Sequence, residues 1–173
     1  MKTRNMALCG MFSALLAVCA WLSFPLGDVA VTLQTFGVFL CLGTLGGKRG
    51  VISILVYLLL GAAGLPVFSG FRGGAGALLG VTGGYLTGFL ASGLVYWLLS
   101  SLFPKYALPA MFAGLILCYC FGSIWYYNVY IGSGGSVSMG IVILKCVLPY
   151  LLPDIIKVLL AWKLGQKLKR FVY

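Results

Sequence analysis

Two charged residues, Asp154 and Lys157, lie three positions apart in the otherwise apolar stretch PYLLPDIIKVLLAW, residues 149–162. On a helix this spacing places both side chains on one face, and the acid precedes the base as the helix dipole favours. A carboxylate and an ammonium in apolar surroundings can neutralise each other, act on a substrate as acid and base, or bind the two ends of a polar ligand.

The composition indicates which surroundings these residues have. The chain has 173 residues, of which 62% are hydrophobic and 8% are charged, and its mean hydropathy is +1.10. A soluble domain of this size needs more charged residues than that to cover its surface. Long apolar segments recur from end to end, so we expect an all-α integral membrane protein in which residues 1–173 form one domain within the lipid bilayer.

Six apolar segments are separated by glycine, proline and charged residues. They lie at 6–24, 31–46, 50–66, 80–103 and 107–130, and the last ends near Leu168. Six transmembrane helices place both termini on one side of the membrane. Nine of the twelve basic residues fall on that side, namely Lys2, Arg4, Lys48, Arg49, Lys105, Lys163, Lys167, Lys169 and Arg170.

Basic residues concentrate in the cytoplasmic loops of membrane proteins. We therefore predict a multi-pass protein of the cytoplasmic membrane with both termini in the cytoplasm. The same distribution accounts for the net charge of +10 without a nucleic-acid partner.

The last segment is too long for one simple span. Residues 139–168 would form a helix of about 45 Å, whereas the hydrocarbon core of a bilayer is about 30 Å thick. Pro149 and Pro153 interrupt the segment, and proline is favoured in a first helical turn. We predict that the spanning helix begins near Pro153 and that 139–148 is a separate element, which places Asp154 near the outer end.

Charge in a span has a cost that bears on the role of Asp154 and Lys157. Each charged side chain is unfavourable by roughly 2.5–3.5 kcal/mol on insertion scales. Two apolar residues would avoid that cost, so we favour ligand binding over a self-neutralising pair, which stays the alternative. An enzymatic role is disfavoured because the chain has no histidine, no nucleophile motif and no second aspartate in a span. The six cysteines form no CxxC motif, so we expect neither a metal nor a cofactor.

The three basic residues that are not on the side of the termini indicate the charge of the ligand. Arg72, Lys145 and Lys157 fall on the outer half, where the acidic residues are Asp28 and Asp154. Surplus positive charge in an outward-facing cavity suits a carboxylate, and Asp154 can accept from N–H donors. The pattern favours a small ligand with a carboxylate at one end and an amide or urea at the other.

A glycine-rich loop precedes the fourth segment, with eight glycines between Gly64 and Gly84. Glycine lets the backbone approach a ligand closely, although tight helix packing is the alternative explanation. Tyr85 offers a wall for a ring system. The predicted binding site therefore comprises, besides the ion pair, Arg72, Gln34, Gly83, Gly84 and Tyr85.

Small residues form two stripes on the first segment. Gly10 and Ala14 make one pair, and Ser13 and Ala17 make another. Such stripes allow a second helix to approach closely. That helix can belong to a partner protein or to this chain itself.

These segments together resemble the BioY family, the biotin-binding S components of energy-coupling-factor (ECF) transporters. The resemblance rests on VTLQTFGVFL at 31–40, GLPVFSG at 64–70, GVTGGYLTGF at 80–89 and LPDIIK at 152–157. It covers nearly the whole chain. The chain departs from the family at Val81, where the family usually has proline, and at Gly10, where its first-helix motif has alanine.

The resemblance implies six helices, an outward-facing pocket and a role in biotin uptake. It implies that Asp154 accepts from the ureido N–H groups and that Lys157, with Arg72, meets the valerate carboxylate. It also implies that Gly10, Ala14, Ser13 and Ala17 dock to a transmembrane coupling subunit. The chain has no G-x-x-x-x-G-K-[ST] motif, so two separate ATP-binding subunits would supply the energy. A binder of another carboxylate-bearing vitamin and an assembly protein that binds no ligand are the alternatives.

Overall fold

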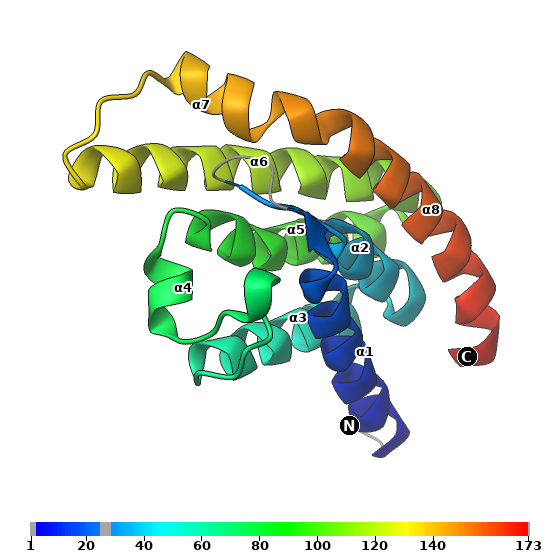
Figure 1. The fold of residues 1–173 in the computed structure, drawn as a ribbon. Helices are drawn as coiled ribbons and strands as arrows, with labels where there is room; N and C mark the ends of the chain where they lie inside the picture. Colours follow the sequence, from blue (N-terminus) through cyan, green and yellow to red (C-terminus); the bar gives the residue numbers. More distant parts are fainter. Residues whose placement is uncertain (1–2, 25–28, 173) are drawn as a thin grey trace.

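Helices dominate the computed structural model, which describes residues 3–24 and 29–172 (Figure 1). Within these ranges six helices have twelve residues or more: α1 (Thr3–Trp21), α2 (Gln34–Leu45), α3 (Gly47–Ala62), α5 (Gly83–Leu102), α6 (Ala107–Gly132) and α8 (Leu148–Val172). Each corresponds to one predicted apolar segment, so the all-α prediction is confirmed. Asp28 and Lys2 lie outside the described residues.

Shorter elements connect these helices. They are the antiparallel strands β1 (Ser23–Phe24) and β2 (Val31–Thr32), the 3-10 turns η1 (Ser69–Phe71) and η2 (Pro104–Tyr106), and the helices α4 (Ala75–Leu79) and α7 (Met139–Cys146). Ser23 pairs with Thr32, and Phe24 with Val31. The strand pair therefore fixes the approach of the chain from α1 to α2.

The helices differ in their capacity to cross a bilayer. By length and composition, α1, α5 and the segment Pro104–Gly132 can each span, and α7 with α8 forms a fourth candidate that is bent by 44°. The two remaining long helices rise only about 18 Å (α2) and about 24 Å (α3). All residues of α2 except Phe36 are buried. Because protein rather than lipid surrounds it, α2 need not match the thickness of the membrane.

The start of the last long helix differs from the prediction. α7 is a separate element, as expected, but α8 begins at Leu148 and contains Pro153 in its interior. Pro149 lies in the first turn, where a missing N–H has no cost. Pro153 removes only one helical hydrogen bond, the one to the carbonyl of residue 149. The helix therefore continues through the second proline rather than beginning there.

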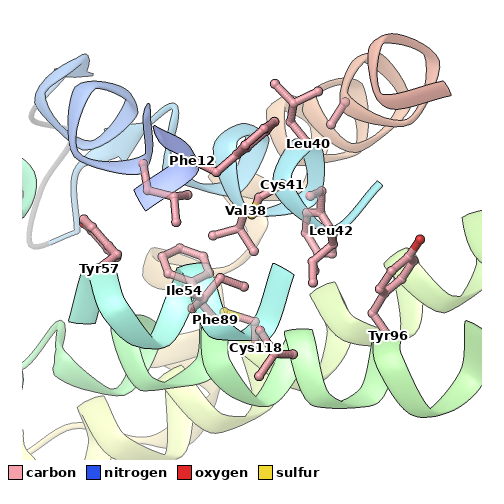
Figure 2. Close-up of a cluster of buried hydrophobic side chains, with 14 of the residues drawn as sticks. Phe12, Val38, Leu40, Cys41, Leu42, Ile54, Tyr57, Phe89, Tyr96 and Cys118 are labelled. Atoms are coloured by element: carbon pink, nitrogen blue, oxygen red, sulfur yellow. The ribbon is translucent and has the colours of Figure 1, made fainter. Parts of the chain in front are cut away.

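The core lies where α1, α2, α3, α5 and α6 converge. Figure 2 shows Phe12 of α1 and Val38 of α2 above Ile54 of α3 and Phe89 of α5. α5 runs along α6, α3 packs on α1 and α5, and α8 curves past α6 to pack on α2 (Figure 1). This arrangement brings the beginnings of α2 and α5 close to the middle of α6 and to α8.

Two positions of the backbone need glycine. Gly46 has φ of 78° and makes the tight turn between α2 and α3. Gly165 of α8 faces Gly43 of α2, and a Cβ at position 165 would lie 3.2 Å from the carbonyl carbon of Gly43. The contact between α2 and α8 therefore depends on the absence of a side chain at Gly165.

Replacing Gly165 with leucine should destabilise the protein, because the side chain would push α8 away from α2. Overpacking of this kind costs typically about 1–3 kcal/mol. The measurement is the midpoint of thermal unfolding in detergent. Gly10→Leu is the matched control, since a Cβ at Gly10 has no atom within 4 Å. Equal midpoints for the two variants would contradict the packing argument.

Candidate functional site

A cavity opens between the beginnings of α2 and α5, the middle of α6 and the first half of α8. It is lined by Val29, Ala30, Thr32, Gln34, Thr35, Phe39, Phe68, Ser69, Arg72, Ala77, Thr82, Tyr85, Leu86, Phe89, Leu115, Cys118, Tyr119, Cys146, Tyr150, Asp154 and Lys157. The walls are mainly aromatic and aliphatic, with a few polar groups. This composition is typical of sites for small molecules.

The ion pair on α8 forms the polar centre of the cavity. Lys157 Nζ lies 2.8 Å from Asp154 Oδ1, and both side chains are nearly buried, with exposed fractions of 12% and 9%. The hydroxyl of Tyr119, on α6, donates to Asp154 Oδ2 at 2.7 Å. Lys157 also donates to the carbonyl of Thr32 at 2.8 Å. One pair of side chains therefore connects α8 with α6 and with β2.

Both charged groups retain hydrogen-bonding capacity. An ammonium has three N–H donors, and Lys157 uses two of them. An ionised carboxylate has about four acceptor positions, and Asp154 uses two. One donor and two acceptor positions remain for a ligand. This is the capacity needed for a ligand that brings one anionic oxygen and two N–H groups.

Other polar side chains position the segment of chain that precedes α2. Gln34 Nε2 donates to the hydroxyl of Tyr57 at 2.6 Å, and Gln34 Oε1 accepts from Thr32 Oγ1 at 3.2 Å. The hydroxyl of Tyr150, on α8, donates to the carbonyl of Val29. Residues 29–32 are thus held against the cavity from both α3 and α8.

The charges of the lining do not cancel. Among the described residues that line the cavity, Arg72, Asp154 and Lys157 are charged, so these residues carry a formal net charge of +1. Arg72 is exposed, and its Nε donates to the carbonyl of Ser69 at 3.2 Å. Lys145, which the sequence also placed on the outer half, is exposed on α7 and does not line the cavity. Among the described residues, the surplus charge of the lining therefore comes from Arg72.

The structure brings together five of the seven residues that the sequence predicted as ligand contacts. Asp154, Lys157, Arg72, Tyr85 and Gln34 line the cavity. Gly83 and Gly84 are not among the residues that line it, and their contact with a ligand stays a prediction. A Cβ at Gly83 would overlap the carbonyl of Leu78, and one at Gly84 would overlap Trp125. Tight packing, the alternative explanation, accounts for both glycines.

The two stripes of small residues on α1 differ in their exposure. Gly10 and Ala14 are exposed. Ser13 is buried, and its Oγ makes hydrogen bonds at 2.8 Å with the carbonyls of Cys9 and Ser53. Ala17 is buried as well. The expectation that all four residues form an outer docking surface is therefore corrected for Ser13 and Ala17, which pack inside the chain.

Sequence reasoning missed several residues that line the cavity. Tyr119 and Tyr150 both donate to site groups, but a single tyrosine in an apolar helix has no pattern that distinguishes it from a packing residue. Phe39, Phe68 and Phe89 form the aromatic walls. Their spacing is that of ordinary core residues, and only the fold shows that they surround one space.

Comparison with known proteins identifies the family. A family model described as the BioY family matches residues 1–173. The chain belongs to the BioY family. The biotin transporter BioY of Thermotoga maritima is 41% identical over 170 residues, which cover 96% of each chain. The probable biotin transporter BioY of Pyrococcus horikoshii is 36% identical over 177 residues, which cover 98% of each.

The fold agrees with BioY membership. A crystal structure of the S-component for biotin from an ECF-type ABC transporter matches with a TM-score of 0.86 and 26% identity. The match covers 98% of this chain and 92% of that one. Members of the BioY family are transporter components rather than enzymes. The apolar helices and the family together identify a multi-pass membrane protein.

The geometry of the ion pair predicts its effect on stability. Lys157→Met should destabilise the ligand-free protein by about 3–5 kcal/mol, because Asp154 would be buried without its countercharge. The double variant Asp154→Asn with Lys157→Met should recover most of that loss. The measurement is unfolding in detergent by heat or denaturant.

Lys145→Met is the control for loss of a positive charge at an exposed position of α7, and we expect no change from it. If Lys157→Met were as stable as the double variant, the pair would contribute nothing to the fold.

Proposed function

We propose that this protein is the biotin-binding S component of an ECF transporter in the cytoplasmic membrane. The observation that carries the proposal is the polar centre of the cavity, which has one donor left on Lys157 and two acceptor positions left on Asp154. Biotin has a carboxylate at one end and a ureido group with two N–H donors at the other. The names of the relatives from T. maritima and P. horikoshii support the same ligand.

The cavity accommodates the parts of biotin as follows. Asp154 accepts hydrogen bonds from the ureido N–H groups. The hydroxyl of Tyr119 holds the Asp154 carboxylate in the orientation that this requires. Lys157 and Arg72 attract the valerate carboxylate, which balances the surplus charge of the lining. Phe39, Phe68 and Phe89 contact the apolar rings and chain. Tyr85 and Gln34 complete the walls.

Energy for concentrative uptake comes from separate subunits in this proposal. They are a transmembrane coupling subunit and two ATP-binding subunits. Support comes from the ECF-type transporter to which the matching crystal structure belongs, and from the lack of a P-loop motif in this sequence. The exposed pair Gly10 and Ala14 on α1 offers the surface at which the coupling subunit docks.

Biotin affinity of variants tests the site. Asp154→Asn should weaken binding, because its amide presents a donor where the ureido group needs an acceptor, and Lys157→Met should weaken it by loss of a charged donor. Loss of one hydrogen bond to a charged group costs about 1.5–3 kcal/mol, or roughly ten- to a hundredfold in affinity. Isothermal titration calorimetry gives the dissociation constants.

The double variant separates binding from structure. Its stability should recover, as described above, but its affinity should not. Biotinamide, which lacks the carboxylate charge, should bind the unmodified protein more weakly than biotin and should be less affected by Lys157→Met. Restored biotin affinity in the double variant would reject this site.

Orientation in the membrane is a further part of the proposal. Arg4 Nη2 lies 2.7 Å from the carbonyl of Val172, so the first and last helices meet at one end of the molecule. The basic residues of the loops gather at this end, which supports a cytoplasmic location of both termini. The cavity then faces outward.

Labelling by a membrane-impermeant thiol reagent tests the orientation in a background whose native cysteines are replaced by alanine. A cysteine at exposed Ala75 should react in intact cells. A cysteine at exposed Lys105 should react only after lysis. The reverse result would overturn the orientation.

A bulky side chain on α1 tests the docking surface. Ala14→Leu should reduce biotin uptake in cells that contain the ECF module, because it obstructs the approach of the coupling subunit, whereas biotin affinity of the purified protein should stay within about twofold. Gly140→Leu on α7 is the control, since a Cβ at Gly140 has no atom closer than 3.9 Å. Equal uptake by the two variants would exclude Ala14 from the docking surface.

A further inference from the structure

A second cavity lies at the opposite end of the molecule from the first. It is lined by Asn5, Leu45, Gly46, Gly47, Lys48, Arg49, Ile52, Tyr96, Trp97, Ser100, Ser101, Pro104, Ala107 and Lys169. These residues come from the beginning of α1, the turn between α2 and α3, the end of α5, the beginning of α6 and the end of α8. Five segments that are distant in sequence thus line one cavity.

The cavity carries positive charge without a matching negative charge. Lys48, Arg49 and Lys169 line it, and none of the described residues that line it is acidic. Asp154, the one acidic residue in the described ranges, lies fifteen residues before Lys169 on the same helix, a rise of about 22 Å. Its charge is already paired with Lys157. Lys48 and Lys169 therefore have no countercharge from the described part of the chain.

Local contacts leave two of these cations available. Arg49 Nη1 donates to Asn5 Oδ1 at 3.1 Å, so its guanidinium is held in place. Among residues 3–24 and 29–172, neither Lys48 nor Lys169 has a hydrogen bond or ion pair. α3 begins at Gly47 and has no side-chain cap, so its first N–H groups add to the positive potential. These charged groups favour an anion.

The surroundings of the cavity indicate which kind of molecule carries the anionic group. Trp97 lines the cavity and is 39% exposed, and Leu94 and Leu98, one turn apart on α5, are 47% and 59% exposed. This apolar face continues from the basic cavity along α5. Tryptophan is enriched where the hydrocarbon core meets the headgroups. A small soluble anion would leave that face uncovered, whereas a lipid with an anionic headgroup would cover it with acyl chains.

We propose that this basic cavity binds the headgroup of an anionic phospholipid. The phosphate lies between Lys48 and Lys169, the hydroxyls of Ser100 and Ser101 donate to headgroup oxygens, and the acyl chains follow the exposed face of α5. The site is independent of the ligand cavity and of biotin. It makes the protein selective among the lipids that surround it.

Native mass spectrometry of the full, delipidated chain tests the proposal, with phosphatidylglycerol and phosphatidylcholine of identical acyl chains as probes. The first phosphatidylglycerol should bind more tightly than the first phosphatidylcholine. Each lysine near an anionic headgroup contributes about fivefold, so the double variant Lys48→Gln with Lys169→Gln should reduce the preference by roughly twenty-five-fold. The matched control removes two charges at the same end, Lys105→Gln with Lys167→Gln, and should keep the preference.

Quenching of Trp97 by brominated lipids in vesicles locates the site. Brominated phosphatidylglycerol should quench more strongly than brominated phosphatidylcholine at equal mole fraction, and the difference should disappear in Trp97→Phe. Folding of each variant is checked by thermal unfolding. Equal binding of the two lipids, or equal losses in the two double variants, would overturn the proposal. Full competition by inorganic phosphate would show that the cavity takes a soluble anion instead of a lipid.

Discussion

The ion pair between Asp154 and Lys157 is the interaction on which the arrangement of the ligand cavity depends. Two isolated charges within a membrane protein are costly, at roughly 2.5–3.5 kcal/mol each on insertion scales. The protein offsets this cost by surrounding the pair with donors and acceptors. Tyr119 satisfies one carboxylate oxygen from α6, and the carbonyl of Thr32 satisfies one ammonium hydrogen from β2. The pair thereby fixes α8 relative to α6 and positions the chain that enters α2.

Much of this site could be predicted from the sequence, because charged residues are rare in the chain. With only two acidic residues in the chain, Asp154 stands out, and the spacing to Lys157 predicts a shared helix face. Hydrophobic segmentation likewise predicted all six long helices. Tyr119 was not predictable, because its significance comes from a contact with a residue 35 positions away. The role of Gly83 and Gly84 could not be decided from the sequence, because glycine serves close packing and ligand approach equally well.

Differences in helix length reflect what surrounds each helix. α2 has twelve residues and is buried by its neighbours, so its boundaries follow from Gln34 and the Gly46 turn rather than from bilayer thickness. Its two ends line the two different cavities, with Gln34 in one and Leu45 in the other. The close contact of Gly43 with Gly165 holds this buried helix against α8. A short helix in the centre thus connects a site for a small ligand with a basic cavity at the chain ends.

The net charge of the ligand cavity has an electrical consequence. Arg72 and Lys157 against Asp154 give the described residues of the empty lining a formal charge of +1, and a bound monoanion such as biotin brings their total to zero. A transmembrane voltage acts on one elementary charge with about 2.3 kcal/mol per 100 mV. It therefore acts on the empty site and scarcely on the occupied one. If the site changes its depth in the membrane during a cycle, the return of the vacant carrier is the voltage-sensitive stage, and passage of the loaded one is electroneutral.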